Sequence, residues 1–122
     1  MTTFAPCTPV LRIFDRAQTL AFYVDFLEMK VDWEHSFEPD SPVYMQVSKG
    51  ECAIQLSEHT GDALPGSCIR IRITELDAWC NYLAGKKYKY ARPGPGQPTD
   101  WKTKETVIRD PSGNKLVFWE ML

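Results

Sequence analysis

The sequence predicts an α+β fold made of two βαβββ modules, which together form a curved eight-stranded mixed sheet with helices on its convex face. A strand pattern followed by an amphipathic helix occurs twice, offset by 60 residues, so that Ile13 corresponds to Ile73. Each helix is followed by enough chain for three strands, with a tight-turn signal between the last two. The 122 residues suit one domain, 1–122, with modules at 8–58 and 66–120.

The first module begins with an alternating strand pattern at residues 8–14. Asp15, followed three residues later by Gln18, is typical of a helix N-cap with its reciprocal partner. The apolar residues that follow recur at the spacing of one helix face, and they are Ala17, Leu20, Ala21, Val24 and Leu27. Three more strands are expected near 29–37, 42–49 and 51–58, with Lys49-Gly50 as a hairpin turn.

The second module repeats this order. Its first strand has a row of isoleucines, Ile69, Ile71 and Ile73, alternating with Cys68, Arg70 and Arg72. Thr74 is the expected N-cap of the second helix, and Gly85 is placed to end it. Strands are expected near 87–92, 103–109 and 114–120, with a turn at 111–114. The proline-rich stretch 93–101 is expected to be a loop, and 59–67 links the modules.

The composition narrows the class of protein. Hydrophobic residues make up 43% and charged residues 25%, which is ordinary for a globular domain. The net charge of −2 gives no reason to expect nucleic acid as a partner, and no apolar run is long enough for a membrane span. The N-terminus has no signal-peptide pattern, so we expect a cytoplasmic protein. The four cysteines are then expected to be reduced.

Side-chain alternation assigns the faces of the sheet. The concave face of the predicted sheet, opposite the helices, forms a cleft. If the isoleucine row packs on the helix, then Cys68, Arg70 and Arg72 face this cleft. Arg12 faces the same cleft from the first strand. The arginines are candidates for anchoring an anionic or carbonyl-rich ligand, or for pairing with Glu105 or Glu120, and the sequence does not decide between these readings.

Three stretches carry a family resemblance. They are PVLRIFDRAQTLAFYVDFLEMKVDWE (9–34), ITELDAW (73–79) and DWKTKETVIRDPSGNKLVFWE (100–120). Together they resemble the glyoxalase/bleomycin-resistance superfamily (vicinal oxygen chelate fold), and the third most resembles its antibiotic-binding branch. The sequence departs from the pattern at Glu28, where a glycine usually ends the first helix. It departs again at Arg70 and Arg72, where bleomycin-resistance proteins carry tryptophans.

The resemblance also implies where a metal would bind in the enzymes of the superfamily. The four positions correspond to Thr8, Gln55, Cys68 and Val117. Because this set lacks carboxylate and imidazole ligands, we expect no metal and no cofactor, and binding in preference to catalysis. The alternative is a metal-dependent lyase, isomerase or dioxygenase with an unusual site at His35, His59 and Glu58.

The favoured interpretation is a homodimeric binding protein that sequesters a small, planar, antibiotic-like ligand of the bleomycin type in a groove shared by two subunits. No catalytic residues are assigned. The predicted ligand-binding residues are Trp33, His35, Arg70, Arg72 and Trp101, the last contributed by the other subunit. Aromatic walls suit a flat ligand, and guanidinium groups favour carbonyl, carboxylate or phosphate groups on it.

Overall fold

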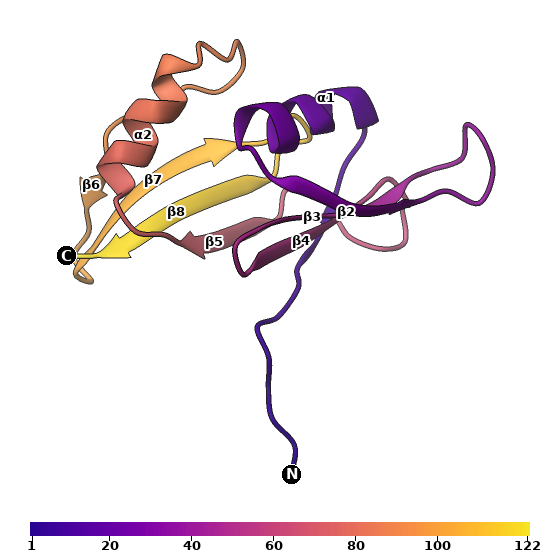
Figure 1. The fold of residues 1–122 in the computed structure, drawn as a ribbon, viewed down its shortest axis with the longest axis horizontal. Helices are drawn as coiled ribbons and strands as arrows, with labels where there is room; N and C mark the ends of the chain where they lie inside the picture. Colours follow the sequence, from indigo (N-terminus) through magenta and orange to yellow (C-terminus); the bar gives the residue numbers. More distant parts are fainter.

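The computed structural model describes all residues, 1–122, and its elements follow the predicted βαβββ order twice (Figure 1). The first module contains β1 (Val10–Arg12), α1 (Arg16–Leu20), its π-helical continuation η1 (Ala21–Phe26), β2 (Lys30–His35), β3 (Tyr44–Lys49) and β4 (Cys52–Ser57). The second contains β5 (Cys68–Arg72), α2 (Leu76–Gly85), β6 (Gln97–Pro98), β7 (Thr103–Arg109) and β8 (Lys115–Met121).

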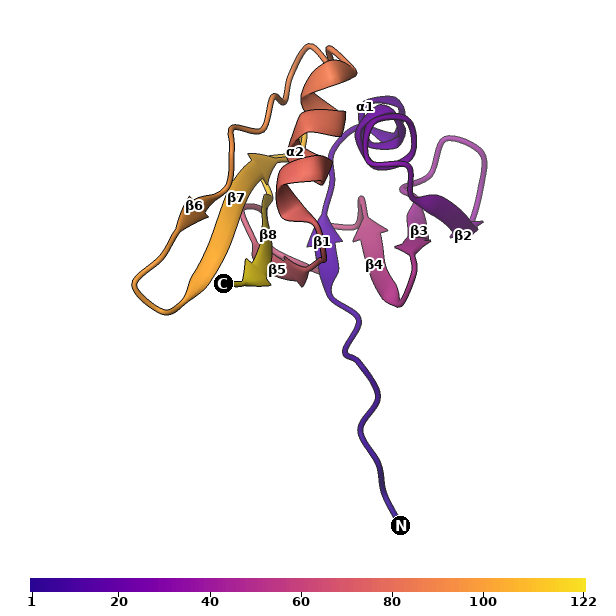
Figure 2. The ribbon, with the colours of Figure 1, turned by 60° about the vertical axis from the view of Figure 1, so that its left-hand side comes forward.

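The eight strands form two hydrogen-bonded sheets of four, one for each module. Their orders are β1-β4-β3-β2 and β5-β8-β7-β6, so β1 and β5 are both edge strands. In each sheet the first strand pairs in parallel with the last strand of its module, and the other neighbours are antiparallel. Figures 1 and 2 show both helices on the same side of the sheets. We call the opposite side the outer face.

The core lies between the helices and the sheets. It is one cluster of 18 buried residues drawn from both modules, including Leu11, Phe22, Ile54 and Leu116. Ile69 and Ile71 pack against this cluster, whereas Arg70 and Arg72 are exposed on the outer face. The predicted alternation of β5 is therefore confirmed.

Several local predictions hold. Asp15 caps α1, because its side chain accepts a hydrogen bond from the Gln18 N–H at 2.9 Å. The second helix ends at Gly85, as expected. Gly50 adopts φ +59° in the β3–β4 hairpin turn, a conformation that glycine enters readily.

Two local predictions were wrong. Thr74 does not cap α2: Glu75, with φ 55°, precedes the helix, and the Glu120 carboxylate of β8 accepts the Leu76 N–H at 3.1 Å instead. Residues 87–92 form no strand, since Lys87 turns the chain with φ 57° and the next side chain, Tyr88, stacks on Phe26.

The missing strand is replaced by β6, which lies inside the stretch predicted to be a loop. This two-residue strand pairs Gln97 with Glu105 and Pro98 with Lys104. Pro98 has no N–H to give to a ladder, which is why such a strand is short and occupies the edge of its sheet.

The two modules are joined by polar contacts at one end of the sheets. The buried Asp110 carboxylate accepts the Tyr23 hydroxyl at 2.7 Å, and Asn114 donates to the Arg12 carbonyl at 2.8 Å. Burial raises the pKa of Tyr23 well above 10, and the Asp110 charge adds to the effect. Between the helices, Glu28 adopts φ 60° and accepts from Tyr82 and Lys86, so the glutamate at this usual glycine position ties the end of η1 to α2.

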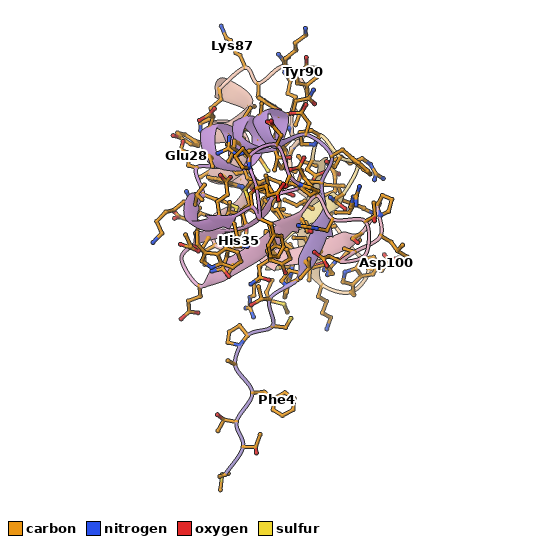
Figure 3. The ribbon with its side chains drawn as sticks, turned by 90° about the vertical axis from the view of Figure 1, so that its right-hand side faces the viewer. Phe4, Glu28, His35, Lys87, Tyr90 and Asp100 are labelled. Carbon is orange, nitrogen blue, oxygen red and sulfur yellow. The ribbon has the colours of Figure 1, made fainter.

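Residues 1–8 are exposed, and the N-terminal segment extends away from both sheets (Figures 1 and 2). Figure 3 shows Phe4 on this segment, where its side chain is 98% exposed. Neither helix is of a length and apolarity that would let it cross a bilayer.

Candidate functional site

The outer face of the second sheet gathers charged and aromatic side chains in rows across the strands. Strand register places Arg72, Trp119 and Glu105 in one row, and Arg70, Val117 and Val107 in the next. We refer to Arg70, Arg72, Trp101, Glu105 and Trp119 as the arginine–tryptophan cluster.

Glu105 is the centre of this cluster. Arg70 donates two hydrogen bonds to it, at 3.1 and 2.6 Å, in a bidentate pair. The Thr103 hydroxyl and the Trp101 indole N–H donate to the same carboxylate at 2.7 and 3.0 Å. These bonds, with that of Arg70 the strongest, lower the pKa of Glu105 to about 2. Trp101 is thus held by its N–H while 63% of the residue remains exposed.

Trp119 supports both arginines. The Arg70 and Arg72 guanidinium carbons lie 5.5 and 5.3 Å from the centroid of its ring, within the range of a cation–π contact. Arg70 is neutralised by Glu105, but Arg72 forms no salt bridge. Arg72 is therefore a cation beside an aromatic surface without a carboxylate partner.

The outer face of the first sheet carries a second aromatic platform. Trp33 stacks on Tyr44, with ring centroids 5.7 Å apart and planes at 4°. The Tyr44 hydroxyl donates to Gln55 at 2.6 Å, and the Gln55 amide donates to Gln46 at 3.0 Å. Gln46 in turn donates to Asp32 at 3.0 Å. This network holds the platform in one orientation.

His35 ends β2 on the same face and makes an edge contact with Phe37, at 4.8 Å between ring centroids. Phe37 also contacts His59 edge-on, so it lies between the two histidines of the alternative metal site. The Glu58 carboxylate accepts the Val43 N–H at 2.9 Å. His35, His59 and Glu58 do not form a convergent ligand set.

The four positions implied by the resemblance do not fit a divalent metal either. Gln55 uses its amide oxygen and nitrogen within the Tyr44–Gln46 network, and Val117 is buried and has no lone pair to offer. No group of three or more His, Cys, Asp or Glu side chains is placed to hold an ion.

The five predicted ligand-binding residues fall into two groups. Arg70, Arg72 and Trp101 come together in the arginine–tryptophan cluster, and Trp101 does so through Glu105 of its own chain. Trp33 and His35 lie on the other sheet, and no hydrogen bond, salt bridge or aromatic contact joins them to the cluster within one chain. The sequence left open whether the arginines pair with acids, and the structure pairs only Arg70.

Sequence reasoning named Glu105 as a possible partner of the arginines, but it did not foresee that Thr103 and Trp101 also donate to Glu105, or that Trp119 contacts both arginines. A signal was present for Trp119, which alternates with the buried Leu116 and Phe118 in β8. The pattern of β7 is weaker, because its inward residues include Lys104 and Thr106. Asp32 was not foreseen, because a β-bulge between Val31 and Trp33 places its carboxylate beside Gln46.

Arg12 adds an unsatisfied cation to the outer face. Its Nε and Nη1 are buried without a hydrogen-bond partner, and its guanidinium lies 4.7 Å from the centroid of the Phe14 ring. Buried donors of a charged group are costly to leave unpaired, so this position would be stabilised by an anion or a carbonyl oxygen.

A cavity lies elsewhere, on the helix side of the sheets. Its volume is about 800 Å³, and of the five predicted residues only Arg72 contributes to its lining. The cavity is bounded by the β3–β4 turn, the end of η1, β5 and α2.

The low pKa of Glu105 makes a prediction about acid stability. A carboxyl group whose pKa falls from 4.5 to about 2 on folding stabilises the fold above pH 4.5, and this contribution is lost as the pH falls toward 2. Because Arg70 is 45% exposed, solvent screening reduces the contribution to about 1–2 kcal/mol.

Urea unfolding of the wild type and of Glu105→Gln, measured between pH 7 and pH 2, checks this. The free energies of unfolding should differ by that amount near neutrality and converge in acid. A difference that stays constant with pH would mean that Glu105 contributes by packing alone.

Comparisons with known proteins agree with the fold. The sequence profile described as glyoxalase superfamily protein matches residues 1–122. No curated protein sequence matches the chain. The bleomycin-binding protein of the bleomycin producer Streptomyces verticillus, solved with copper(II)-bleomycin, is 25% identical; the match covers 97% of each chain, with a TM-score of 0.71.

Two other solved structures are similar at lower identity. TnmS3, an antibiotic-binding protein from Streptomyces sp. CB03234, is 17% identical over 100% of this chain and 99% of that one, with a TM-score of 0.79. The bleomycin resistance determinant encoded on transposon Tn5 is 17% identical over 97% and 98% of the respective chains, with a TM-score of 0.73. At these identities the two matches establish a shared fold.

Proposed function

The chain belongs to the glyoxalase superfamily, and we propose that it is a metal-free, cytoplasmic binding protein that sequesters a small planar compound on the outer face of its sheets. The observation that carries this proposal is the arginine–tryptophan cluster. Trp101 is exposed and held by its indole N–H, and Trp119 lies beneath the guanidinium groups of Arg70 and Arg72. Because Arg72 has no carboxylate partner, these side chains form a surface for a flat molecule with an anionic or carbonyl group.

The electrostatics of the cluster give the ligand a preferred charge. Arg72 and the buried Arg12 donors would both attract an anion or a carbonyl oxygen, and Glu105 is already fully used by its donors. Like charge would repel a strongly cationic compound. Bleomycin, which the Streptomyces verticillus protein binds, is cationic at one end, so we expect weaker binding here, through its planar part.

We further propose that two chains form the complete groove. In one chain no hydrogen bond or aromatic contact joins the Trp33 platform to the arginine–tryptophan cluster, β1 and β5 each end the strand order of their sheet, and residues 1–8 are exposed. Open edges are usually covered, and a two-fold dimer would cover them while creating two equivalent grooves.

Light scattering at micromolar concentration should give the mass of a dimer, and deletion of residues 1–8 should weaken it. A monomer mass for the intact chain would refute the shared groove. Elemental analysis of protein purified without added metal tests the metal-free part of the proposal, since stoichiometric zinc, nickel, manganese or iron would contradict it.

Titration of tryptophan fluorescence with a naphthoate and with bleomycin tests the binding proposal directly. Replacing Trp101 by Ala should weaken the binding of naphthoate about tenfold, because a stacking contact is worth about 1–1.5 kcal/mol. Tyr90→Ala is the control, since Tyr90 is an exposed aromatic residue remote from the cluster. If a tight planar ligand is found and Trp101→Ala leaves its affinity unchanged, the proposed site is wrong.

A further inference from the structure

Because the chain is an internal repeat, its two modules contact each other at two equivalent junctions. Side chains fill one junction and leave a cavity at the other. In each module the turn between the last two strands faces the first strand and the helix of the other module. The β7–β8 turn, residues 110–114, faces β1, α1 and η1, whereas the β3–β4 turn, residues 50–51, faces β5 and α2. The 60-residue offset pairs Arg12 with Arg72 and Phe14 with Thr74 across these junctions.

The first junction is filled by polar side chains of its long turn. Asp110 accepts the Tyr23 hydroxyl, Ser112 accepts the Phe14 N–H at 3.0 Å, and Asn114 donates to the Arg12 carbonyl. The second turn has only Gly50 and Glu51 between its paired strand ends, and neither residue forms a hydrogen bond to β5 or α2. The shorter turn therefore leaves the cavity of about 800 Å³ where its counterpart is closed.

The cavity has apolar walls and a polar mouth. The walls are formed by Leu27, Met29, Cys52, Ile71, Ile73, Trp79 and Phe118. The mouth is marked by the exposed residues Lys49, Gly50, Glu51, Arg72 and Thr74. This volume is within the range of small-molecule sites in proteins, roughly 300–1,000 Å³.

Lys49 is the cation at the mouth that is not directed to the outer face. Lys49 forms no salt bridge; its Nζ donates a long hydrogen bond to the Glu28 carbonyl at 3.4 Å and lies 5.2 Å from the centroid of the Trp79 ring. The Arg72 guanidinium is directed to Trp119 on the outer face, so Lys49 is the cation available at the mouth. Glu51 opposes it from the same turn without an ion pair of its own.

We propose that this cavity is a second ligand site, separate from the outer face, for an amphipathic carboxylate such as a fatty acid. The apolar tail enters between η1 and α2, against Leu27, Ile73 and Phe118. The carboxylate remains at the mouth, where Lys49 binds it.

The cysteines provide a direct test. Cys52 is half-buried and lines the cavity, and desolvation raises the pKa of its thiol. Cys7 and Cys68 are exposed outside the cavity. Alkylation by iodoacetamide at mildly alkaline pH, followed residue by residue by mass spectrometry, should be slowed at Cys52 by dodecanoate and left unchanged at Cys7 and Cys68.

Matched probes and variants define the chemistry of the site. Lys49→Ala should weaken the binding of dodecanoate about fivefold, Lys49→Arg should retain it, and Glu51→Gln should strengthen it. Dodecanol, which has the same tail and no charge, should respond to none of these changes. From octanoate to dodecanoate, affinity should rise by up to about fourfold for each added methylene.

Three results would overturn the proposal. One is the absence of Cys52 protection by dodecanoate below its micelle concentration. Another is equal protection of Cys7, Cys52 and Cys68, which would indicate a general effect on the protein. The third is protection of Cys52 that rises with protein concentration in the absence of any fatty acid, because a second chain would then cover the cavity.

Discussion

Asp110→Ala should lower the free energy of unfolding by about 3–4 kcal/mol, the largest effect expected from any polar substitution in this chain. The carboxylate is 5% exposed and accepts four hydrogen bonds. They come from the Tyr23 hydroxyl, the Asn114 side chain, and the backbone N–H groups of Ser112 and Asn114, at 2.7–2.9 Å. Removing it leaves buried donors unpaired where the two modules meet.

Tyr23→Phe should cost only about 1–2 kcal/mol, since it removes one bond and leaves Asp110 its other three donors. Asp25→Ala is the surface control and should stay within about 0.5 kcal/mol, because its side chain is exposed and forms no hydrogen bond. The measurement is urea unfolding near neutral pH. A loss below about 1 kcal/mol for Asp110→Ala would show that water replaces the carboxylate at the junction.

The contacts between the modules also account for the characteristic sequence of the β7–β8 turn. Asp110, Ser112, Gly113 and Asn114 belong to the stretch on which the family resemblance mainly rests. Gly113 adopts φ +90°, and the three polar residues bond across to the first module. The motif is therefore a module-joining device. The sequence showed it as a hairpin turn, but it did not show which partners the side chains reach.

Strand faces were predictable because a period of two leaves little freedom when one face is apolar. The isoleucine row fixed the outward direction of Arg70 and Arg72, and the register of β5 with β8 agrees with it. Thr74 failed as a helix cap for a reason that lies far away in the sequence. Glu120, on the last strand, supplies the acceptor for the first helical N–H, and local pattern reasoning does not reach such a partner.

The candidate site was predictable in its residue types and less so in its connections. Trp101 was expected beside the arginines of the partner subunit, whereas here it is held by Glu105 of its own chain, which Arg70 also reaches diagonally across β8. A diagonal contact between strands depends on register, which composition and periodicity do not give. The cavity was not foreseen either, although comparing residues 50–51 with 110–114 would have shown that one turn is too short to fill its junction.

The second large effect concerns the ligand charge, and it rests on the proposed function. Arg72→Glu should weaken the binding of naphthoate about a hundredfold, close to 3 kcal/mol, and should strengthen the binding of naphthylmethylammonium, which has the same ring with the opposite charge. The reason is that Arg72 lies over Trp119 without an ion pair, whereas Arg70 is neutralised by Glu105. A carboxylate at position 72 would reverse the sign of the charge beside the stacking surface.

Arg109→Glu is the matched control. Arg109 projects from the same face and forms no salt bridge, but its row contains Lys115 and Cys68 and no aromatic residue. The same charge change there should alter naphthoate affinity by less than about threefold, as expected for a screened charge at a distance. The measurement is isothermal titration of naphthoate and of naphthylmethylammonium into the wild type, Arg72→Glu and Arg109→Glu. Equal losses from the two reversals would mean that the ligand responds to the overall positive charge of the face, and that Arg72 has no special place in the site.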